Sequence, residues 1–417
     1  MTEAYGFDER GVKRIIAAVR EVEQGAGPGF HRRRFKTPQE PGGISWQIKR
    51  IAASDSSTYD KNNADVVCDG TADEEDFCSL LGGTTPATTY PNESVTPIIG
   101  CVRLQVARGN YYFSKSVVLP MFCELVYVSS GGSCPVNYVA IQPESGATIY
   151  AAIDASKSVW AALLGDSGKF KIVANGSDRF TSGIVASSRE AVSNSMRGDG
   201  NLYVRYWEVD VNSYGFFLSG MGRVSLDAVT VTTATRGVYV GNSAYLLISK
   251  STLTGPGAGG LAGIQTSHGG ILQLWDTDVT QYASGYGATL WSDIFTVNSC
   301  SFDNNQNGFY AVPGNCLFGS VHNSQANNNT GTGWATSCHV FYMSQPNASG
   351  NGTNFNCSNV ITFDTGWPVG DRGSGLYGWL SDGTNSGKDC TTYDYSSGGV
   401  LYTLVNFPGG LSKSFRR

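Results

Sequence analysis

Two short stretches of the chain pair carboxylates in the way that acid–base chemistry requires. Glu208 and Asp210 lie two residues apart in "WEVD". Asp276 and Asp278 lie two residues apart in "WDTD", and each pair follows a tryptophan. In a β-strand, residues at this spacing project from one face, about 7 Å apart. Hydrolysis of a glycosidic bond uses two carboxyl groups, about 5 Å apart for retention or about 6.5 to 9.5 Å apart for inversion.

A third acid extends the second pair. Asp303, in "CSFDNN", falls near the register of Asp278 if the two segments stack, which makes Asp276, Asp278 and Asp303 the candidate catalytic residues of a polysaccharide depolymerase. The alternative is that these acids are solvated groups on a strand-rich surface. The sequence contains no metal-ligand spacing, P-loop or dinucleotide fingerprint, so we predict neither a metal site nor a cofactor. The ten cysteines form no C-x-x-C and are expected to be reduced.

A repeat determines where these acids lie. A phrase that starts with glycine recurs at intervals of 22, 26, 24, 21 and 25 residues. Its copies begin at Gly215, Gly237, Gly263, Gly287, Gly308 and Gly333. The residues one and three places after each glycine are mostly apolar, and such alternation indicates a strand. A second alternating run and an Asn/Ser/Thr-rich stretch follow, so each unit contains a strand, a turn, a strand, a turn and a short third strand.

Units of about 24 residues cannot bury their inner faces alone and must stack on their neighbours. We therefore predict an all-β fold, a single-stranded right-handed parallel β-helix over residues 101–364. The leading glycine would permit either a positive φ or a close approach of two backbones at a corner. The composition agrees, because Gly contributes 53 of 417 residues and charged residues only 15%.

The second residue after each glycine should point away from the core. These positions are occupied by Phe217, Tyr239, Gln265, Thr289, Tyr310 and Ala335. Aromatic side chains stacked about 5 Å apart on successive coils could form a platform for sugar rings or the seam of a homotrimer. The candidate residues for either role are Phe217, Tyr239, Tyr310, Trp275 and Trp291.

The segment 51–100 leads into the first coil and should cap it. Within "DVVCDGTADEEDFCSLL" (65–81), Thr71 or Asp73 can act as the N-cap of a short helix. The side chains that this helix would lay over the first coil are Phe77, Leu80 and Leu81. A cap is expected because a solenoid exposes an apolar cross-section at each end.

The order of these features resembles the opening of pectate-lyase-like β-helices, especially bacteriophage tailspikes. The resemblance is carried by D-G-T-x-D at 69–73, the short helix and the strand pair "RGNYYFSKSVVLP" (108–120). It differs in having "DEED" where two aspartates are usual. The resemblance implies the β-helical fold, and it implies a virion protein that contacts a glycan of the host surface.

The two ends of the chain differ from the repeat. Residues 1–50 contain apolar side chains at helical spacing, which predicts one short amphipathic helix, and a basic run follows it. The residues predicted to anchor the chain to a virion are Val12, Ile15, Ile16, Val19, Arg32, Arg33 and Arg34. The alternative is a helix folded back on its own β-helix. Residues 365–417 are rich in aromatics and are expected to form a C-terminal cap or a trimer-closing segment.

Together with the resemblance to tailspikes, these features imply a homotrimeric bacteriophage tailspike or tail fibre that is located in the virion and assembled in the host cytoplasm. Its partners would be other virion proteins, through residues 1–50, and a host cell-surface polysaccharide. The alternatives are a capsid decoration or head fibre protein without enzymatic activity, and a free polysaccharide-degrading enzyme. A net charge of −5 disfavours nucleic acid, and the absence of a long apolar run disfavours membrane insertion.

Overall fold

The computed structural model describes most of the chain between residues 46 and 416. The described residues are 46–88, 101–128, 132–165, 170–187, 200–243, 245–267, 269–312, 316–336, 338, 340–344, 346–357, 360–361, 391–397, 400–406 and 412–416. The predicted N-terminal helix and its anchor residues Val12, Ile15, Ile16, Val19, Arg32, Arg33 and Arg34 lie outside them. Contacts within the chain separate residues 1–45 from residues 46–417 as two units.

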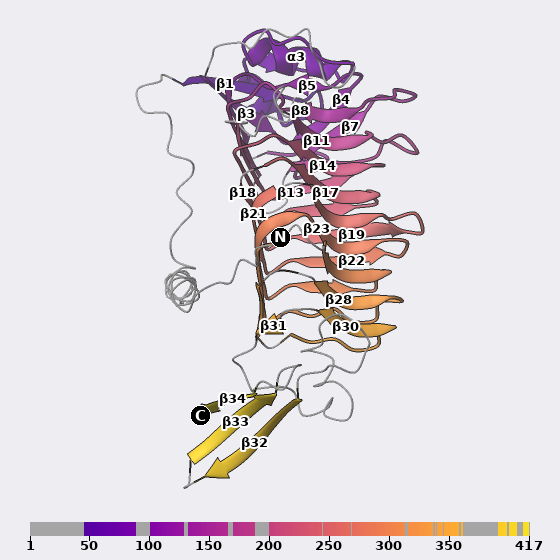
Figure 1. Cartoon of the computed structure of the whole chain (residues 1–417). Coiled ribbons are helices and arrows are strands. Elements are labelled where there is room, and N and C mark those ends of the chain that lie inside the picture. The colour runs from indigo at the N-terminus through magenta and orange to yellow at the C-terminus, as the bar shows by residue number, and fades with distance from the viewer. Residues whose placement is uncertain are drawn as a thin grey trace, which may run out of the picture. The chain divides into compact units, whose positions relative to one another are not determined.

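Three parallel sheets form the body of the second unit, and consecutive strands visit them in turn (Figure 1). Sheet 1 has 13 described strands. In order they are β2 (Val66–Val67), β1 (Gln47–Ala52), β3 (Cys101–Ala107), β6 (Phe122–Val128), β9 (Trp160–Leu164), β12 (Asn201–Arg205), β15 (Arg223–Asp227), β18 (Tyr245–Ser249), β21 (Gly269–Trp275), β24 (Ser292–Asn298), β27 (Phe318–His322), β29 (Val340–Ser344) and β31 (Val360–Ile361).

The other two parallel sheets have shorter strands. Sheet 2 contains β25 (Ser301–Asp303), β22 (Asp278–Tyr282), β19 (Thr252–Gly257), β16 (Thr230–Thr232), β13 (Trp207–Asp210), β10 (Phe170–Ile172), β7 (Val139–Pro143) and β4 (Gly109–Phe113). Sheet 3 contains β30 (Thr353–Cys357), β28 (Thr332–Thr336), β26 (Asn307–Ala311), β23 (Tyr286–Leu290), β20 (Ala262–Ser267), β17 (Arg236–Gly241), β14 (Tyr214–Ser219), β11 (Ser182–Ser187), β8 (Ala151–Asp154) and β5 (Val117–Val118).

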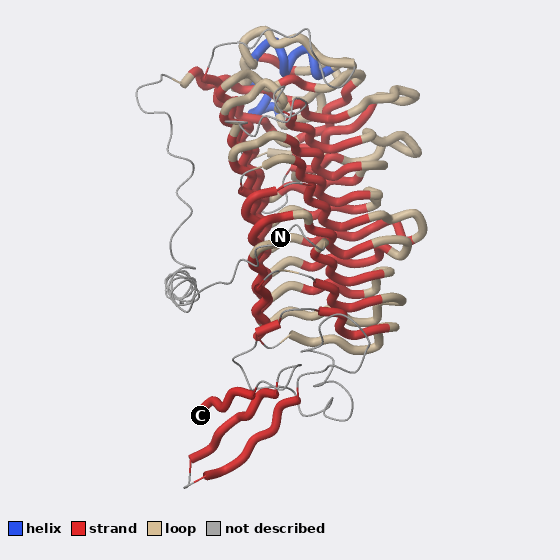
Figure 2. Tube along the Cα trace, in the orientation of Figure 1, coloured by secondary structure: helices blue, strands red, loops and turns tan. Residues whose placement is uncertain are grey.

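This arrangement is a right-handed parallel β-helix, as predicted, and the described chain is all-β with two short helices, α2 (Thr58–Asn62) and α3 (Asp73–Leu80). Figure 2 shows the strands in stacks joined by turns, with both helices at one end. The glycine-led phrases are the strands of sheet 3, and their register is the predicted one. Phe216 pairs with Val238, which pairs with Ile264 on the next coil. All three side chains belong to one continuous core.

The leading glycines are required by close contact and not by a positive φ. None of the six repeat glycines has a positive φ. A Cβ on Gly237 would lie 2.6 Å from the carbonyl oxygen of Gly263, and one on Gly263 would lie 2.7 Å from that of Gly287. Each glycine therefore makes room for the backbone of the next coil. Of the two alternatives offered by the sequence, close approach is correct and the positive φ is wrong.

Positive φ values occur instead at the corner between sheets 1 and 2. One residue on each of six successive coils has a left-handed φ between 44° and 55°. These residues are Tyr206, Ala228, Lys250, Asp276, Ser299 and Asn323. Their types share no property, so the turn is set by the stacking of the coils rather than by a residue preference.

Buried asparagines hold the corner between sheets 2 and 3. The Oδ1 atom of Asn305 accepts from the backbone N–H of Tyr282, at 3.0 Å. Asn329 makes the same kind of hydrogen bond one coil later, where its Oδ1 accepts from the backbone N–H of Asn305 at 2.9 Å. Its Nδ2 also donates to the carbonyl of Phe302, at 3.0 Å. Asn351 continues the row by accepting from the N–H of Asn329, at 2.8 Å. These side chains satisfy backbone groups that the turn leaves without strand partners.

The first coil is closed by α3. Phe77 packs edge-on against Tyr111 and Phe113, with ring centroids 5.3 and 5.4 Å apart. The predicted cap over the first coil is therefore present, with Phe77 and Leu81 buried. The predicted N-cap is wrong, because Ala72 occupies that position with a left-handed φ of 47° and makes no side-chain bond.

The acidic residues of the cap bind the free edge of sheet 2. Strand β4 is the last strand of that sheet, and its outer N–H groups have no strand partner. These groups belong to Asn110, Tyr112 and Ser114 and donate to the carboxylates of Asp55, Asp73 and Glu74, at 2.9, 2.8 and 3.0 Å respectively. The "DEED" stretch thus fastens the cap helix to the first coil.

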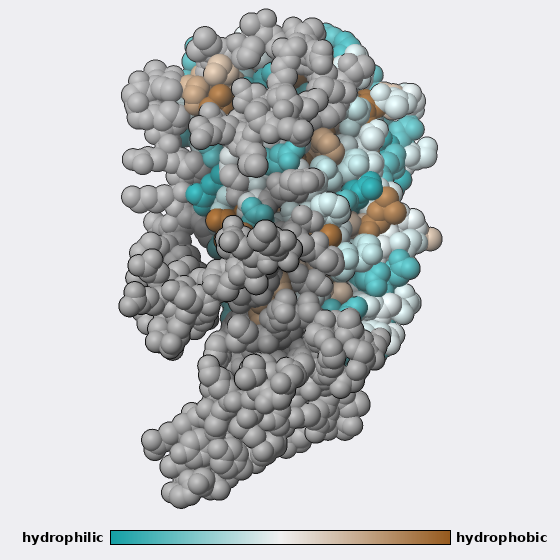
Figure 3. Space-filling model, viewed as in Figure 1, coloured by the Kyte–Doolittle hydropathy of each residue, from teal (hydrophilic) through white to brown (hydrophobic). Residues whose placement is uncertain are grey.

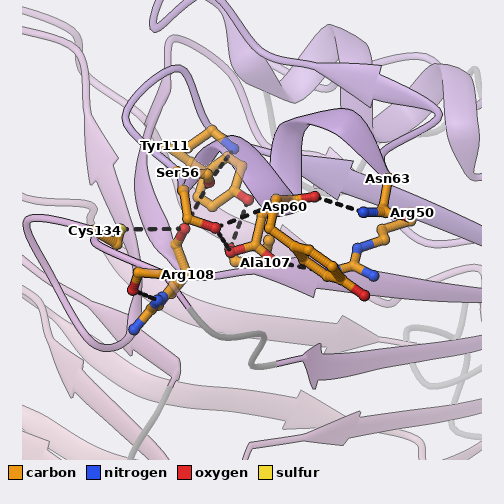
Figure 4. A network of polar contacts seen from close by, with 12 residues as sticks. Arg50, Ser56, Asp60, Asn63, Ala107, Arg108, Tyr111 and Cys134 are labelled. Atoms are coloured by element: carbon orange, nitrogen blue, oxygen red, sulfur yellow. Dashed lines mark hydrogen bonds and ion pairs between the residues drawn. The ribbon is translucent and has the colours of Figure 1, made fainter.

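A polar network joins the start of sheet 1 to α2 (Figure 4). Asp60 is fully buried, and its carboxylate accepts from Nη2 of Arg50 at 2.7 Å and from Oγ of Ser57 at 2.6 Å. Ser56 donates to the carbonyl of Arg108 at 2.6 Å, across to the loop before β4. Since a buried carboxylate without a partner is strongly unfavourable, this pairing fixes how the lead-in segment meets the coil.

The buried acid of the cap predicts a dependence of stability on pH. Burial raises the pKa of Asp73 from 3.8 to about 6. The folded protein therefore binds a proton more tightly than the unfolded chain, and stability should fall as the pH rises from 3.8 to about 6. Each pKa unit corresponds to about 1.4 kcal/mol, so we expect a loss of about 1 to 3 kcal/mol.

Thermal denaturation of the wild type and of Asp73→Asn between pH 3.5 and pH 7 measures this effect, since the amide that replaces the carboxyl group cannot titrate. The control is Glu75→Gln, because the Glu75 carboxylate is exposed and lies 3.3 Å from Nζ of Lys115. The difference in thermal stability between the wild type and Asp73→Asn should change between pH 3.5 and pH 7. A difference that stays constant over this range would contradict the raised pKa of Asp73.

The described part of the chain has three further features that bear on function. The C-terminal strands β32 (Thr391–Ser397), β33 (Val400–Asn406) and β34 (Ser412–Arg416) form an antiparallel sheet that the sequence did not predict. Eight cysteines within the described residues are free thiols. No helix among the described residues is long and apolar enough to cross a membrane.

Candidate functional site

The outer face of sheet 3 carries the predicted row of outward side chains. Phe216 and Leu218 are buried, and Phe217 between them is half-buried on the outer side. Phe217 pairs with Tyr239 on the next coil, and their rings stack at a centroid distance of 5.1 Å and an interplanar angle of 9°. The prediction that these two residues share an outer row is confirmed, and their rings form a stacked pair on the outer side of the sheet.

A second aromatic column lies beside the first. Tyr214 contacts Phe217 edge-on at 5.1 Å and Tyr239 at 6.0 Å. Tyr214 was not predicted, because strict alternation places residues three apart on opposite faces. The strand pairing keeps one constant register through Tyr214–Arg236 and Phe216–Val238, and the ring contacts of Tyr214 place it beside Phe217 and Tyr239.

Arg236 is held in place by two side chains of this surface. Its Nε donates to Oε1 of Gln265 at 2.8 Å, and its Nη1 donates to the hydroxyl of Tyr214 at 3.2 Å. Its guanidinium carbon lies 5.4 Å from the centroid of the Tyr214 ring. We call Tyr214, Phe217, Arg236, Tyr239 and Gln265 the aromatic platform.

The same two columns continue further along the sheet. Tyr286 and Tyr310 stack at a centroid distance of 5.5 Å and an interplanar angle of 24°. Between Tyr239 and Tyr310, the outer positions of the row are taken by Gln265 and Thr289, in the predicted register. The row therefore combines aromatic and polar groups along successive coils, an arrangement that suits an elongated amphipathic ligand.

The candidate carboxylates lie on a different sheet from the aromatic platform. Asp278 begins β22 in sheet 2, and Asp303 ends β25 on the next coil. Asp276 is not in the same strand as Asp278, because it is a corner residue with φ of 47°. The premise that Asp276 and Asp278 project from one face of a strand is therefore wrong. The catalytic role of these residues stays a prediction.

The register also separates Asp278 from Asp303. Asp278 pairs with Ser301, and Asp303 pairs with Thr280. The two acids are diagonal neighbours on one face, a relation that places Cβ atoms about 7 to 8 Å apart. Partial burial, and secondly the charge of Asp303, raises the pKa of Asp278. A raised pKa is what a general acid requires.

Asp303 is extensively hydrogen-bonded. Its Oδ2 accepts from Oγ of Ser301 at 2.7 Å and from Nε2 of Gln325 at 2.6 Å. Its Oδ1 accepts from the backbone N–H of Asn327 at 2.6 Å. These bonds orient the carboxylate and connect neighbouring coils, so Asp303 also acts as a structural brace.

The "WEVD" carboxylates are engaged in ion pairs. Glu208 pairs with Lys171, and Asp210 accepts from Nε of Arg179 at 3.2 Å. Asp210 also accepts from the hydroxyl of Thr233. Both acids are thus bound to neighbouring coils, and they are poorer candidates for proton transfer than Asp278.

The two candidate tryptophans fall at different corners. Trp275 ends β21 in sheet 1 and is half-buried, directly before the corner residue Asp276. Trp291 lies between β23 and β24, where the chain passes from sheet 3 to sheet 1. The structure therefore separates the predicted aromatic set into Phe217, Tyr239 and Tyr310 on sheet 3 and one tryptophan at each of two corners.

Exposed apolar side chains gather near Trp291 on the outer side of sheet 1. Ile271 pairs with Ile294 on the next coil. Trp291, Ile271, Ile294 and Leu317 are exposed by 40%, 41%, 37% and 58%. We call these four residues the apolar stripe. The part of one face that Figure 3 colours has only small brown patches between pale and teal surface.

One group of described residues has ligand atoms close enough to hold a metal ion. The ligand atoms of Cys68, Asp73 and Asp76 all lie within 4.8 Å of one another, a proximity that the sequence spacing did not indicate. Both oxygens of Asp73 already accept backbone N–H groups, from Gly70 at 3.0 Å and from Tyr112 at 2.8 Å. The geometry is explained by the attachment of the cap, so it does not indicate a metal site.

No model of a known protein family matches the chain, and no curated protein matches it. Among solved structures, a protein described as ORF18 of Geobacillus virus E2 overlaps it with a TM-score of 0.48 and 11% sequence identity. The overlap covers 81% of this chain and 71% of that one. Function must therefore be inferred from the side chains of this chain.

Proposed function

We propose that the chain is a bacteriophage virion protein, a tailspike or tail fibre, that binds a host-surface glycan along the outer face of sheet 3. The observation that supports this most is the aromatic platform, where Phe217 and Tyr239 stack face to face beside Arg236. Flat aromatic rings bordered by a few fixed polar groups suit the alternating apolar and hydroxyl faces of sugars. The capped β-helix and the tailspike-like "DGTAD" opening are in keeping with this role.

The test uses the purified chain and the surface polysaccharide of the host bacterium. Binding should be measurable, and the double variant Phe217→Ala/Tyr239→Ala should weaken it at least about 10-fold, because two stacking surfaces are lost. The matched control is Tyr245→Ala, which removes a half-buried aromatic from the outer face of sheet 1. A chain that binds neither host cells nor their glycans would favour a capsid decoration or head fibre protein.

We also propose that the apolar stripe forms the seam of a homotrimer. Large exposed aliphatic side chains in register on adjacent coils are typical of a surface covered by another subunit. The aromatic platform, with its hydroxyl, amide and guanidinium groups, is better suited to a polar ligand. This divides the two roles that the sequence left open for the outward aromatics.

Charging the apolar stripe should therefore dissociate the trimer. Ile294→Asp places a carboxylate in the seam, and sedimentation velocity should show a shift from trimer to monomer. The control is Leu261→Asp, since Leu261 is similarly exposed but precedes β20 in sheet 3. A trimer that tolerates Ile294→Asp, or a wild-type chain that is monomeric, would count against this seam.

Attachment to the particle is proposed for the N-terminal residues. Residues 1–50 were predicted as the anchor, and β1 starts at Gln47 within sheet 1. A deletion that tests attachment should therefore end at residue 45, so that the first coil keeps its strand. The shortened chain should fail to join virions assembled in the host cytoplasm, and its incorporation would contradict the anchor.

Glycan cleavage is a second candidate function, favoured by the raised pKa of Asp278 next to Asp303. Asp278 would donate the proton to the leaving group, Asp303 would activate water, and Asp276 and Trp275 would border the site. Asp278→Asn should abolish any depolymerase activity and leave glycan binding at the aromatic platform intact. Retained activity would show that the catalytic site lies elsewhere.

A further inference from the structure

Arg236 stands apart from most of the arginines on the described outer faces of the coils. Arg103, Arg179 and Arg205 each form an ion pair with a carboxylate, and the last two do so at 3.2 Å. No carboxylate of the described chain lies within 4.0 Å of the Arg236 guanidinium. Its positive charge is therefore held at the surface without a counter-charge from any residue that the structure describes.

The guanidinium is nevertheless fixed in position. Two of its five N–H groups are used, by Gln265 and by the Tyr214 hydroxyl, and the ring of Tyr214 supports it. Three N–H groups remain available on Nη1 and Nη2. A planar guanidinium with free N–H groups matches the two oxygens of a carboxylate or a sulfate.

The position of this charge also matters. Arg236 is in β17, the strand that carries Tyr239, and it pairs with Tyr214 across the sheet. Phe217 and Tyr239, stacked at 5.1 Å, lie next to it on the same face. A sugar ring on these two aromatics would place a substituent within reach of the guanidinium.

We propose that the aromatic platform selects an acidic saccharide, whose ring packs on Phe217 and Tyr239 and whose carboxylate or sulfate binds Arg236. This inference rests on the proposed glycan-binding function and adds the class of ligand to it. An acidic ligand is also consistent with the lack of a carboxylate next to Arg236 among the described residues. A carboxylate there would repel the ligand and neutralise the charge of the arginine.

The experiment measures dissociation constants of the full chain for matched pairs of oligosaccharides. Polygalacturonate and alginate oligosaccharides supply carboxylates, and the same oligosaccharides after carboxyl reduction supply neutral counterparts. Dextran sulfate and dextran oligosaccharides form the sulfate pair. At least one acidic member should bind at least about 10-fold more tightly than its neutral counterpart, because charge-assisted hydrogen bonds are lost in the neutral form. The pair that discriminates identifies carboxylate or sulfate as the anion.

Three variants connect this selectivity to the platform. Arg236→Gln should weaken the acidic ligand about 10- to 100-fold and the neutral one much less, so that the preference for the acidic member is lost. Arg223→Gln is the matched control. Arg223 also lies over a tyrosine, with its guanidinium carbon 5.0 Å from the Tyr245 ring centroid. It belongs to sheet 1, however, and has no stacked aromatic pair beside it among the described residues. Phe217→Ala/Tyr239→Ala should weaken acidic and neutral ligands alike. Unchanged thermal midpoints confirm that the variants are folded.

The possible outcomes separate the two proposals. Equal binding of acidic and neutral members, or unchanged acidic binding in Arg236→Gln, would overturn the acidic class and leave glycan binding in place. Failure of every saccharide to bind would overturn both. A change from trimer to monomer in Arg236→Gln would show that the platform is a subunit contact, and it would also overturn the proposal.

Discussion

Gly263→Ala is expected to destabilise the β-helix by more than about 4 kcal/mol, which is at the upper end of single-residue effects. The new Cβ would lie 2.0 Å from Cγ1 of Val279 and 2.7 Å from the carbonyl oxygen of Gly287. The valine could rotate, but the carbonyl belongs to the backbone of the next coil. The two strands would have to separate, and their hydrogen bonds would be lost.

The matched control for this prediction is Gly241→Ala. Gly241 ends β17, and a Cβ there would lie no closer than 3.3 Å to any neighbour, the Oγ of Ser219. We expect its effect to stay within about 1 kcal/mol. Thermal denaturation and limited proteolysis of both variants measure the contrast. Similar stability of the two variants would mean that the coils do not approach each other as closely as the structure indicates.

Asn329→Ala should cost about 2 to 5 kcal/mol, because two buried backbone groups would lose their partners. The backbone N–H of Asn305 donates to Oδ1 of Asn329 at 2.9 Å, and Nδ2 of Asn329 donates to the carbonyl of Phe302 at 3.0 Å. The side chain also bonds Asn351 at 2.9 Å and so connects three coils. Its loss should weaken the corner on both sides.

Asn356→Ala is the control for the asparagine row. Asn356 is exposed on β30, in the same part of the β-helix, and its replacement should change the free energy of unfolding by less than about 0.5 kcal/mol. Denaturant unfolding and hydrogen exchange at the corner amides compare the two. Equal protection of the Asn305 amide in both variants would be evidence against the bonding scheme.

The coil repeat was predictable because it is governed by local rules. Alternation after each glycine identifies the inner face, and the spacing of the glycines gives the length of a coil. The asparagine row was also detectable, since Asn305, Asn329 and Asn351 are separated by 24 and 22 residues, as the coils are. From the sequence alone these segments were predicted only as polar turns.

The corner geometry could not be predicted in the same way. Asp276 takes a left-handed φ at a position where other coils have Tyr206, Ala228 or Lys250. Because no residue preference marks this position, "WDTD" looks like a continuous strand, and the pairing of Asp276 with Asp278 was misjudged. Tertiary stacking overrides the local pattern at this corner.

The aromatic platform shows the same limit. Phe217 and Tyr239 follow from alternation, but Tyr214 does not, because alternation places it on the opposite face from Phe217 although their rings are in contact. The hydrogen bonds of Arg236 depend on which side chains the neighbouring coils place beside it. Its partner Gln265, for example, lies 29 residues away in sequence. Sequence patterns find the row, whereas the charge and the hydrogen bonds of the site require the register.

The most direct test of the central claim is a cryo-EM map of the full chain with oligosaccharide fragments of the host-surface polysaccharide. We expect saccharide density on the outer face of sheet 3, with a ring against Phe217 and Tyr239 and a substituent at Arg236. Density confined to Asp278 and Asp303 on sheet 2, or a second subunit packed on the aromatic platform, would contradict the claim.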